Sequence, residues 1–336
     1  MNTPDHPSKN PKSKRPSADH AALAAEAFFG KPIEKITAPG GRERASVRIH
    51  FQDQQIIASW RADPKRRLRE IRILEYLSQA EADVPTLLGV HDGWTFQSDV
   101  GSRRLTSALL RRSGAHRDDL AVAAIESLVR IKQTIQKDFL RDTPSIATSP
   151  AWALRFASGP RRLGHALDAP APEIDENALA HSILDLPVEF VKWDARPGNA
   201  AVSDDGRIIW FDWEDYGRRI GMEDTAFLVA DEFWPFTADK SVELLEQTGV
   251  LKQQNRSVFF RFAALQAIQR CLLIIDQQQK FGWYDADRAR RYDRIGVSQE
   301  LLANCMKNAE FFAAQDQSTQ SLTPWLAKLS TSAKML

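Results

Sequence analysis

The stretch that decides the fold is residues 188–231, which read VEFVKWDARPGNAAVSDDGRIIWFDWEDYGRRIGMEDTAFLVAD. Asp194 follows one short apolar run, residues 188–191, and Asn199 stands five residues later. A second apolar run ends at Asp212, thirteen residues beyond Asn199. The segment therefore places an Asp, an Asn and a second Asp around two apolar runs that are separated by a turn.

The residues between Asn199 and Asp212 have the pattern of a β-hairpin. Residues 200–202 are predicted as a short strand, residues 203–206 (SDDG) have the chemistry of a tight turn, and residues 207–211 are predicted as the returning strand. A hairpin of this length brings Asn199 and Asp212 together at its open end, beside the preceding loop.

These three side chains suit phosphoryl transfer from ATP. One carboxylate must orient and deprotonate the acceptor hydroxyl, while an Asn and another carboxylate hold the Mg²⁺ ions that bridge the phosphates. The segment offers all three groups, with Asp194 as the candidate base and with Asn199 and Asp212 as the candidate metal ligands.

The same segment resembles the catalytic and metal-binding loops of the aminoglycoside phosphotransferase family, a branch of the protein-kinase-like fold. The family pattern is roughly H-G-D-x-x-P-G-N, a hairpin, then I-D-W-E. This chain has Lys192-Trp193-Asp194, Pro197-Gly198-Asn199 and Phe211-Asp212-Trp213-Glu214 in that order. It departs from the pattern where Lys192 replaces the family His and Trp193 replaces a Gly.

The resemblance implies an α+β, two-lobed protein-kinase-like fold. The N-lobe would be an antiparallel sheet plus a helix, and the C-lobe would be mainly helical with a catalytic β-hairpin. We expect a disordered polar tail at residues 1–19, an N-lobe at 20–101 that binds the nucleotide phosphates, and a C-lobe at 102–336 with the catalytic loop, metal site and acceptor pocket. Adenine would hydrogen-bond the linker backbone somewhere between residues 97 and 101.

A glycine turn and an ion pair are the candidate phosphate-binding features of the N-lobe. Gly40 and Gly41 lie between two predicted strands, where backbone N–H groups could approach a polyphosphate, although two glycines also simply make a turn. Arg61 ends a third strand, and Glu70 lies on a helix that begins near residues 63–64. They match the positions of a phosphate-binding Lys and its Glu partner, with Arg in place of Lys. The alternative is a surface cation and a solvated Glu.

Composition excludes several other classes of protein. The chain of 336 residues carries 45 Lys and Arg against 44 Asp and Glu, so no overall charge favours nucleic acid or an acidic membrane surface. The chain has only two cysteines, which cannot form a disulfide framework. Polar residues interrupt its best apolar run, which argues against a membrane-spanning helix. The first twenty residues are polar, which argues against a secretion signal. We expect a cytoplasmic protein that binds neither nucleic acid nor membrane; its oligomeric state is open.

The acceptor is less constrained than the phosphoryl donor. Six acidic residues after the hairpin would suit a cationic acceptor, such as an amino sugar, an aminoglycoside or a choline-like amine; they are Glu214, Asp215, Glu223, Asp224, Asp231 and Glu232. Acidic loops are also commonly just solvated surface. The sequence therefore predicts a small-molecule kinase that uses ATP and Mg²⁺. The alternative is a pseudokinase, a nucleotide-sensing or protein-binding module without turnover, which the departures at Lys192 and Trp193 favour.

Overall fold

The computed structural model describes residues 16–38, 46–184, 188–291 and 295–332. The expected tail at residues 1–19 lies almost wholly outside these ranges, as does the glycine turn with Gly40 and Gly41. The tail and the phosphate-binding role of the turn therefore stay predictions.

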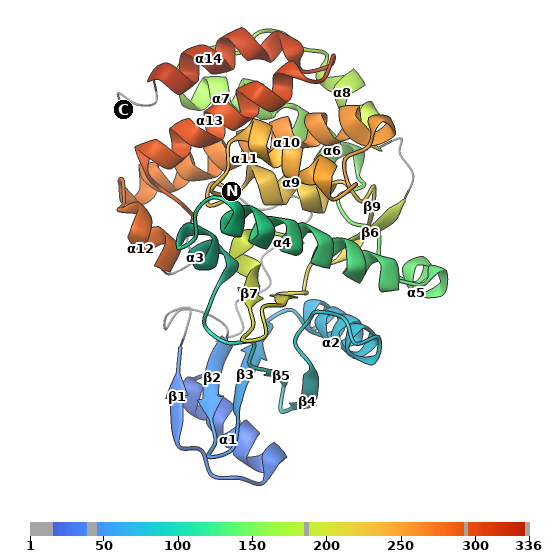
Figure 1. Cartoon of the computed structure of the whole chain (residues 1–336), viewed down its shortest axis with the longest axis vertical. Coiled ribbons are helices and arrows are strands. Elements are labelled where there is room, and N and C mark those ends of the chain that lie inside the picture. Colours follow the sequence, from blue (N-terminus) through green and yellow to red (C-terminus); the bar gives the residue numbers. More distant parts are fainter. Residues whose placement is uncertain (1–15, 39–45, 185–187, 292–294, 333–336) are drawn as a thin grey trace.

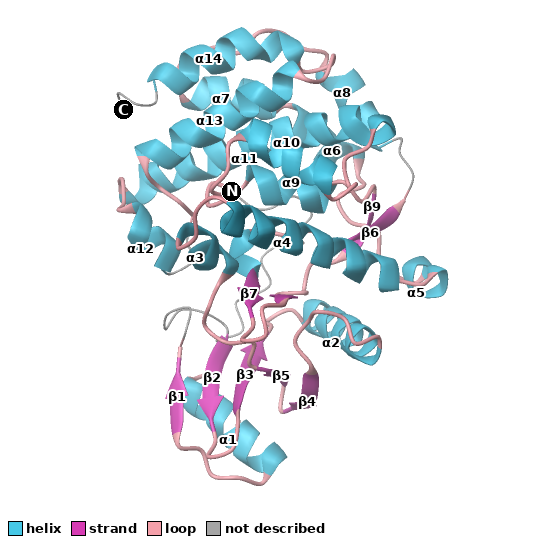
Figure 2. Cartoon of the chain, viewed as in Figure 1, coloured by secondary structure: helices cyan, strands magenta, loops and turns pink. Residues whose placement is uncertain are grey.

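The N-terminal part is a five-stranded antiparallel sheet (Figures 1 and 2) in the order β1-β2-β3-β5-β4. Successive side chains of its strands point alternately to a buried face and to the face toward the rest of the chain, because side chains in a strand repeat every two residues. On the buried face, small residues of the helix α1 pack against side chains such as Ile49 and Phe96. The elements are α1 (Ala18–Phe29), β1 (Lys35–Thr37), β2 (Ser46–His50), β3 (Gln55–Trp60), β4 (Leu87–His91) and β5 (Trp94–Ser98).

The helix α2 (Pro64–Gln79) carries the candidate residue Glu70. Asp63 caps its first turn by accepting from the backbone N–H of Lys65 at 2.8 Å, and Pro64 occupies the first helical position. The apolar face of α2, including Leu74 and Leu77, belongs to the large core of the helical part and not to the core of the sheet. The helix therefore joins the two parts of the molecule.

The C-terminal part is mainly helical and lies at the opposite end of the molecule from the sheet (Figure 1). Its helices are α3 (Leu105–Leu110), α4 (Ala115–Thr134), α5 (Lys137–Arg141), α6 (Pro150–Ala157), α7 (Gly159–Ala166), α8 (Glu176–Leu184), α9 (Glu223–Ala230), α10 (Ala238–Gln247), α11 (Arg256–Phe281), α12 (Ala286–Arg291), α13 (Gln299–Ala314) and α14 (Thr323–Ser332). The division at residues 101 and 102 stays a prediction, because α2 shares its core with these helices.

The long helix α11 is the centre of the helical part. Residues 253–281 are long and apolar enough to cross a membrane by length and composition alone, which the sequence pattern had not led us to expect. In this structure 72% of the most apolar window is buried, and α11 packs against α7, α9 and α13. Cys271 on α11 and Cys305 on α13 are buried free thiols. The helix is therefore packed here as a core helix.

The predicted hairpin is confirmed. Strand β7 (Ala200–Val202) pairs in antiparallel register with β8 (Ile208–Trp210), after a 3₁₀ turn at Pro197–Asn199. A second small pair joins β6 (Glu189–Val191) to β9 (Gly217–Arg219). Figure 1 shows the hairpin between the sheet and the helices, which puts its open end in position to contact both.

Candidate active site

The loop after β6 presents Asp194. Trp193, the residue before it, has φ of 78°, a left-handed conformation that costs a non-glycine residue free energy. The buried carboxylate of Asp224 holds this conformation by accepting from the backbone N–H of Lys192 at 2.8 Å and of Trp193 at 2.7 Å. The loop thus keeps its tight turn although the family Gly is absent.

The ring of Trp193 explains how a large residue fits there. It contacts Trp152 and Phe227, at ring-centroid distances of 5.7 and 5.2 Å. The buried guanidinium of Arg219 lies over both tryptophans, 4.2 Å from the centroid of Trp152 and 5.5 Å from that of Trp193, and pairs with Glu223. Apolar and cation–π packing therefore offset the backbone strain.

Asn199 contacts Asp194 directly. Its Nδ2 donates to Oδ2 of Asp194 at 2.6 Å and to the backbone oxygen of Asp194 at 3.0 Å. Its own backbone oxygen accepts from the N–H of Phe211 at 3.0 Å, across the open end of the hairpin. The Oδ1 of Asn199 takes no part in these contacts, so it is the atom that could ligate a metal ion.

Lys192 ties the Asp194 loop to the Asp212 loop. The side chain is 1% exposed, and its Nζ donates to the backbone oxygen of Asp212 at 2.9 Å and to that of Asp194 at 3.3 Å. It also lies 5.0 Å from the ring centroid of Trp213. Burial lowers the pKa of Lys192, and the nearby carboxylates of Asp194, Asp212 and Asp224 oppose that shift. Lys192 can therefore position both loops in place of the family His.

Asp212 is the second non-glycine residue of the site with a left-handed backbone, at φ of 61°. Its Oδ1 accepts from Nη2 of Arg61 at 2.6 Å. Burial alone would raise the pKa of Asp212, but the positive charges of Arg61 and Lys192 outweigh it and lower that pKa. The carboxylate is therefore held ionised, as a metal ligand must be.

Arg61 and Glu70 form the predicted pair. Nε and Nη2 of Arg61 donate to the two Glu70 oxygens at 2.9 and 2.8 Å, and Glu70 is 1% exposed. The alternative of two solvated side chains is therefore wrong. Nε of Arg61 also lies 3.2 Å from Oε2 of Glu214. Burial, reinforced by Asp212 and Asp215 and opposed by Arg61, raises the pKa of Glu214 to about 7.

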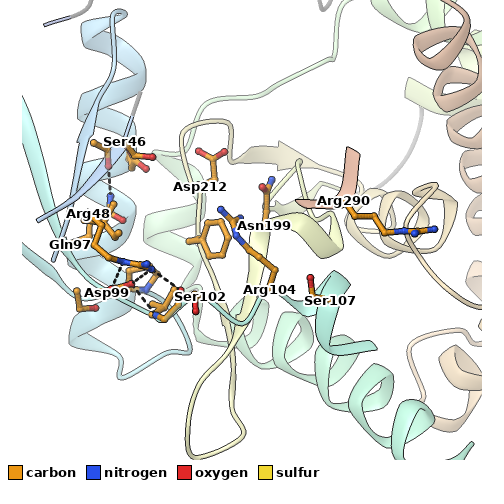
Figure 3. Close-up of a pocket in the computed structure, with 18 of the residues that line it drawn as sticks. Ser46, Arg48, Gln97, Asp99, Ser102, Arg104, Ser107, Asn199, Asp212 and Arg290 are labelled. Carbon is orange, nitrogen blue, oxygen red and sulfur yellow. Dashed lines mark hydrogen bonds and ion pairs between the residues drawn. The ribbon is translucent and has the colours of Figure 1, made fainter. Parts of the chain in front are cut away.

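A cavity of about 550 Å³ lies between the sheet and the hairpin, and Figure 3 shows residues that line it. Asn199, Asp212 and the Arg61–Glu70 pair line it together, so the structure brings four candidate residues to one place. Asp194 is not among the lining residues. It borders the cavity through Asn199, and its side chain is 43% exposed. The contribution of Gly40 and Gly41 lies outside the described residues.

A second cavity, of about 490 Å³, adjoins the first, because Leu110 and Arg290 line both. Aromatic side chains and Asp231 line it. Asp231 is 2% exposed, and its Oδ2 has no hydrogen-bond partner among the described residues, with Nη2 of Arg270 3.8 Å away. Burial, then the neighbouring charge of Glu232, raises the pKa of Asp231 to about 7.

Arg196 lies beside the Asp194 carboxylate. Its Nε lies 3.4 Å from Oδ1 of Asp194. Its positive charge also lowers the pKa values of Asp231 and Glu232, although burial outweighs it at Asp231.

The donor set fits Mg²⁺. Asp212 and Asn199 offer one carboxylate and one amide oxygen at the same cavity, and Mg²⁺ is usually held by one or two protein oxygens together with phosphates and water. Within the described residues, no group of three or more His, Cys, Asp and Glu side chains could hold a metal ion. A metal at this site would depend on the phosphates for the rest of its ligands.

Sequence reasoning missed two of the positioning residues. The sequence pattern places Asp224 only within an acidic stretch; the apolar run that follows it, the later part of helix α9, is the signal that this Asp could be an internal acceptor, and the structure buries it fully. The sequence pattern shows Lys192 only as a departure from the family, whereas its Nζ makes the contacts that join the two loops. The other acidic residues after the hairpin mostly pair with Arg or Lys side chains of the chain itself.

We expect Asp224→Ala to lower the free energy of unfolding by about 3–5 kcal/mol, because it leaves two backbone N–H groups and the Lys132 ammonium without their buried acceptor. Urea denaturation measures this change. The matched control is Glu126→Ala, which removes an exposed ion pair with Arg130 and should change the free energy by less than about 1 kcal/mol. Equal effects of the two variants would contradict the anchoring role.

Comparisons with known proteins agree with this fold. The chain resembles an amicoumacin kinase in complex with AMP-PNP and Ca²⁺ (TM-score 0.55, 16% identity, covering 79% of this chain and 90% of that one). It also resembles an ADP-bound aminoglycoside phosphotransferase (0.54, 13%, 88% and 99%) and the choline kinase LicA from Streptococcus pneumoniae (0.51, 15%, 85% and 99%). At these identities the likeness shows the protein-kinase-like fold alone.

A search of curated protein sequences finds no match. The model of the phosphotransferase enzyme family matches residues 39–257, which is more than half of the chain. The resemblance and the fold class expected from the sequence are thereby confirmed: the chain belongs to the phosphotransferase enzyme family.

Proposed function

We propose that the protein transfers the γ-phosphoryl group of a nucleoside triphosphate, bound with Mg²⁺, to a hydroxyl group of a small amine-bearing molecule. The observation that carries this proposal is the convergence of Asp212, Asn199 and the Arg61–Glu70 pair on one cavity, with Asp194 hydrogen-bonded to Asn199 at its border. The family resemblance of the sequence implies that this nucleoside triphosphate is ATP.

The described residues can perform each task that the reaction needs. The Asp194 carboxylate would accept the proton of the acceptor hydroxyl, and the Nδ2 contact from Asn199 would orient it for that step. Asp212 and Oδ1 of Asn199 would hold the Mg²⁺, which neutralises charge on the phosphates. Arg61, oriented by Glu70, would contact a phosphate oxygen.

The second cavity supports an amine-bearing acceptor. Phe233, Trp234, Phe236 and Phe311 offer aromatic faces, which attract a cation, and the Asp231 carboxylate offers an oxygen that lacks a hydrogen-bond partner in the described chain. The structural neighbours are named for amicoumacin, aminoglycosides and choline. An acceptor of this general class, such as an amino sugar or a choline-like amine, fits both observations.

One observation favours the pseudokinase alternative. Nη2 of Arg61 contacts Oδ1 of Asp212 at 2.6 Å, and a metal ion would compete with it for that oxygen. Against this alternative, the Asp, Asn and Asp side chains of the reaction are all present, and Lys192 and Trp193 fit their positions without disturbing the loop. Turnover decides between the two.

Asp212→Ala and Asp194→Asn should separate binding from chemistry. We expect Asp212→Ala to abolish the rise in melting temperature that nucleoside triphosphate with Mg²⁺ produces, because the metal loses its carboxylate ligand. Asp194→Asn should keep that rise but lower turnover by about 10²-fold or more, because its amide cannot take the proton. Thermal shift and release of nucleoside diphosphate in a screen of amino sugars, aminoglycosides and choline-like amines measure these effects.

The control for this experiment is Asp205→Ala, at the closed end of the same hairpin, where the carboxylate pairs with exposed Arg207. It should leave both readouts unchanged. The kinase assignment fails if no nucleotide shifts the melting temperature of the unaltered protein. Asp194 is not the base if turnover survives Asp194→Asn undiminished.

Asp231→Asn should stabilise the protein at pH 8 and weaken acceptor binding. The pKa of Asp231 is raised from 3.8 in the unfolded chain to about 7 in the folded protein, so at a pH between these two values folding takes up a proton. The free energy of unfolding therefore falls as the pH rises from about 4 to about 7, and it stays low at higher pH. Asn cannot ionise, so the melting temperature should rise by on the order of 2 °C or more at pH 8 and change little at pH 5.

Binding of the amine acceptor to the unaltered protein should strengthen as pH rises from about 6 to about 8, because Asp231 then becomes ionised. This dependence should vanish in Asp231→Asn. The matched control is Asp138→Asn, an exposed carboxylate beside Arg141, which should alter neither stability nor acceptor binding. If Asp231→Asn destabilises the protein at pH 8, the carboxylate is structural and the acceptor assignment is wrong.

A further inference from the structure

Arg219 and Glu223 form an ion pair in the interior of the helical part, and the proposed reaction does not use it. Their side chains are 2% and 0% exposed. Nη2 of Arg219 and Oε2 of Glu223 have no hydrogen-bond partner among the described residues. Burial lowers the pKa of Arg219 and raises that of Glu223, so the loss of hydration outweighs the attraction at both groups. Such a pair rarely stabilises a protein relative to apolar residues of similar size, so stability alone does not explain it.

The contacts of Arg219 lead to the residue before the candidate base. Its Nε donates to Oε1 of Glu223, and its Nη1 donates to the backbone oxygen of Ala147, in the segment before α6. These two acceptors fix the plane of the guanidinium. Its central carbon lies 4.2 Å from the ring centroid of Trp152 and 5.5 Å from that of Trp193. The pair therefore holds a flat cation against the ring of Trp193.

The first turn of α9 thus holds Trp193 at two places. Asp224 accepts from the backbone N–H groups of Lys192 and Trp193. Glu223, the residue before Asp224, orients the guanidinium that lies against the Trp193 ring. Trp193 has a left-handed backbone, and for a non-glycine residue that strain is equivalent to on the order of a tenfold or larger shift in population. Without the ring contacts, the loop that carries Asp194 would leave this conformation for part of the time.

We propose that Arg219 and Glu223 are positioning residues of the reaction. Through the ring of Trp193 they keep the Asp194 carboxylate in its place beside Asn199. This inference rests on the proposed phosphotransferase function, and it concerns the rate of the reaction and not the binding of nucleotide. A glycine at position 193 would need no such support, because glycine adopts a positive φ without strain. The ion pair is therefore required because of Trp193.

The test replaces the whole pair, in the double variant Arg219→Met with Glu223→Met, because the loss of one partner would leave a buried unpaired charge. The assay is release of ADP from ATP with Mg²⁺ and the amino sugars, aminoglycosides and choline-like amines of the acceptor screen. We expect kcat to fall at least about tenfold, while KM for ATP changes by less than about twofold. In a protein that also carries Trp193→Gly, the double change should lower kcat by less than about threefold.

Hydrogen–deuterium exchange of the amide at position 193, without nucleotide, measures the same effect independently of turnover. The double variant should exchange this amide at least about tenfold faster than the unaltered protein, because the loop opens more often. In the Trp193→Gly background the double change should leave the rate within about threefold. The control is Arg261→Met on α11, which removes a contact with buried Asp316 and should keep both kcat and this exchange rate.

Two results overturn the inference. One is an unchanged kcat and exchange rate in the double variant. The other is an equal loss with and without Trp193→Gly, which would make the pair a structural element that does not act through Trp193. If no acceptor in the screen gives turnover, the proposed function fails, and the exchange rates alone then show whether the pair holds the Asp194 loop.

Discussion

The carboxylate of Asp224 is the group on which the site depends. It accepts two consecutive backbone N–H groups, those of Lys192 and Trp193, and so fixes the turn that presents Asp194. Asp224 itself is held at the start of α9, in the core of the helical part, and pairs with Lys132 of α4 at 3.1 Å. The geometry of the Asp194 loop is thereby set by contacts in the protein interior, where little can move.

The second constraint is the way the sheet is joined to the helices. Glu70 lies on α2, whose apolar face packs with the helical part, while Arg61 follows directly on β3 of the sheet. Arg61 contacts both Glu70 and Asp212, so one side chain joins the sheet, α2 and the hairpin. The residues proposed to hold the phosphates are therefore positioned by both parts of the molecule, although the apolar cores of the two parts are separate.

Much of this arrangement follows from the sequence. The alternation of residues 200–202 and 207–211 around an Asp-Gly turn predicted the hairpin, and the spacing of Asp194, Asn199 and Asp212 predicted their convergence, because both signals are local. The acidic stretch after the hairpin suggested a surface for a cationic acceptor, but most of its carboxylates pair with Arg or Lys side chains of the chain itself. The sequence of charges does not show which carboxylates are paired inside the fold. Lys192 and Asp224 act through partners from 2 to 92 residues away, and spacing alone reveals no such contact.

The Arg61–Asp212 contact has a consequence for the energy of the empty cleft. Three carboxylates, those of Glu70, Asp212 and Glu214, surround the single guanidinium of Arg61, so the region that would receive a metal carries more negative than positive charge before the metal binds. A bound Mg²⁺ would take over the attraction to Asp212, and Arg61 would exchange that carboxylate for a phosphate oxygen. The Mg²⁺ would offset the excess negative charge, and the ionic contacts that already hold these side chains would limit the rearrangement that binding requires. The cleft is in this sense preorganised for its ligand.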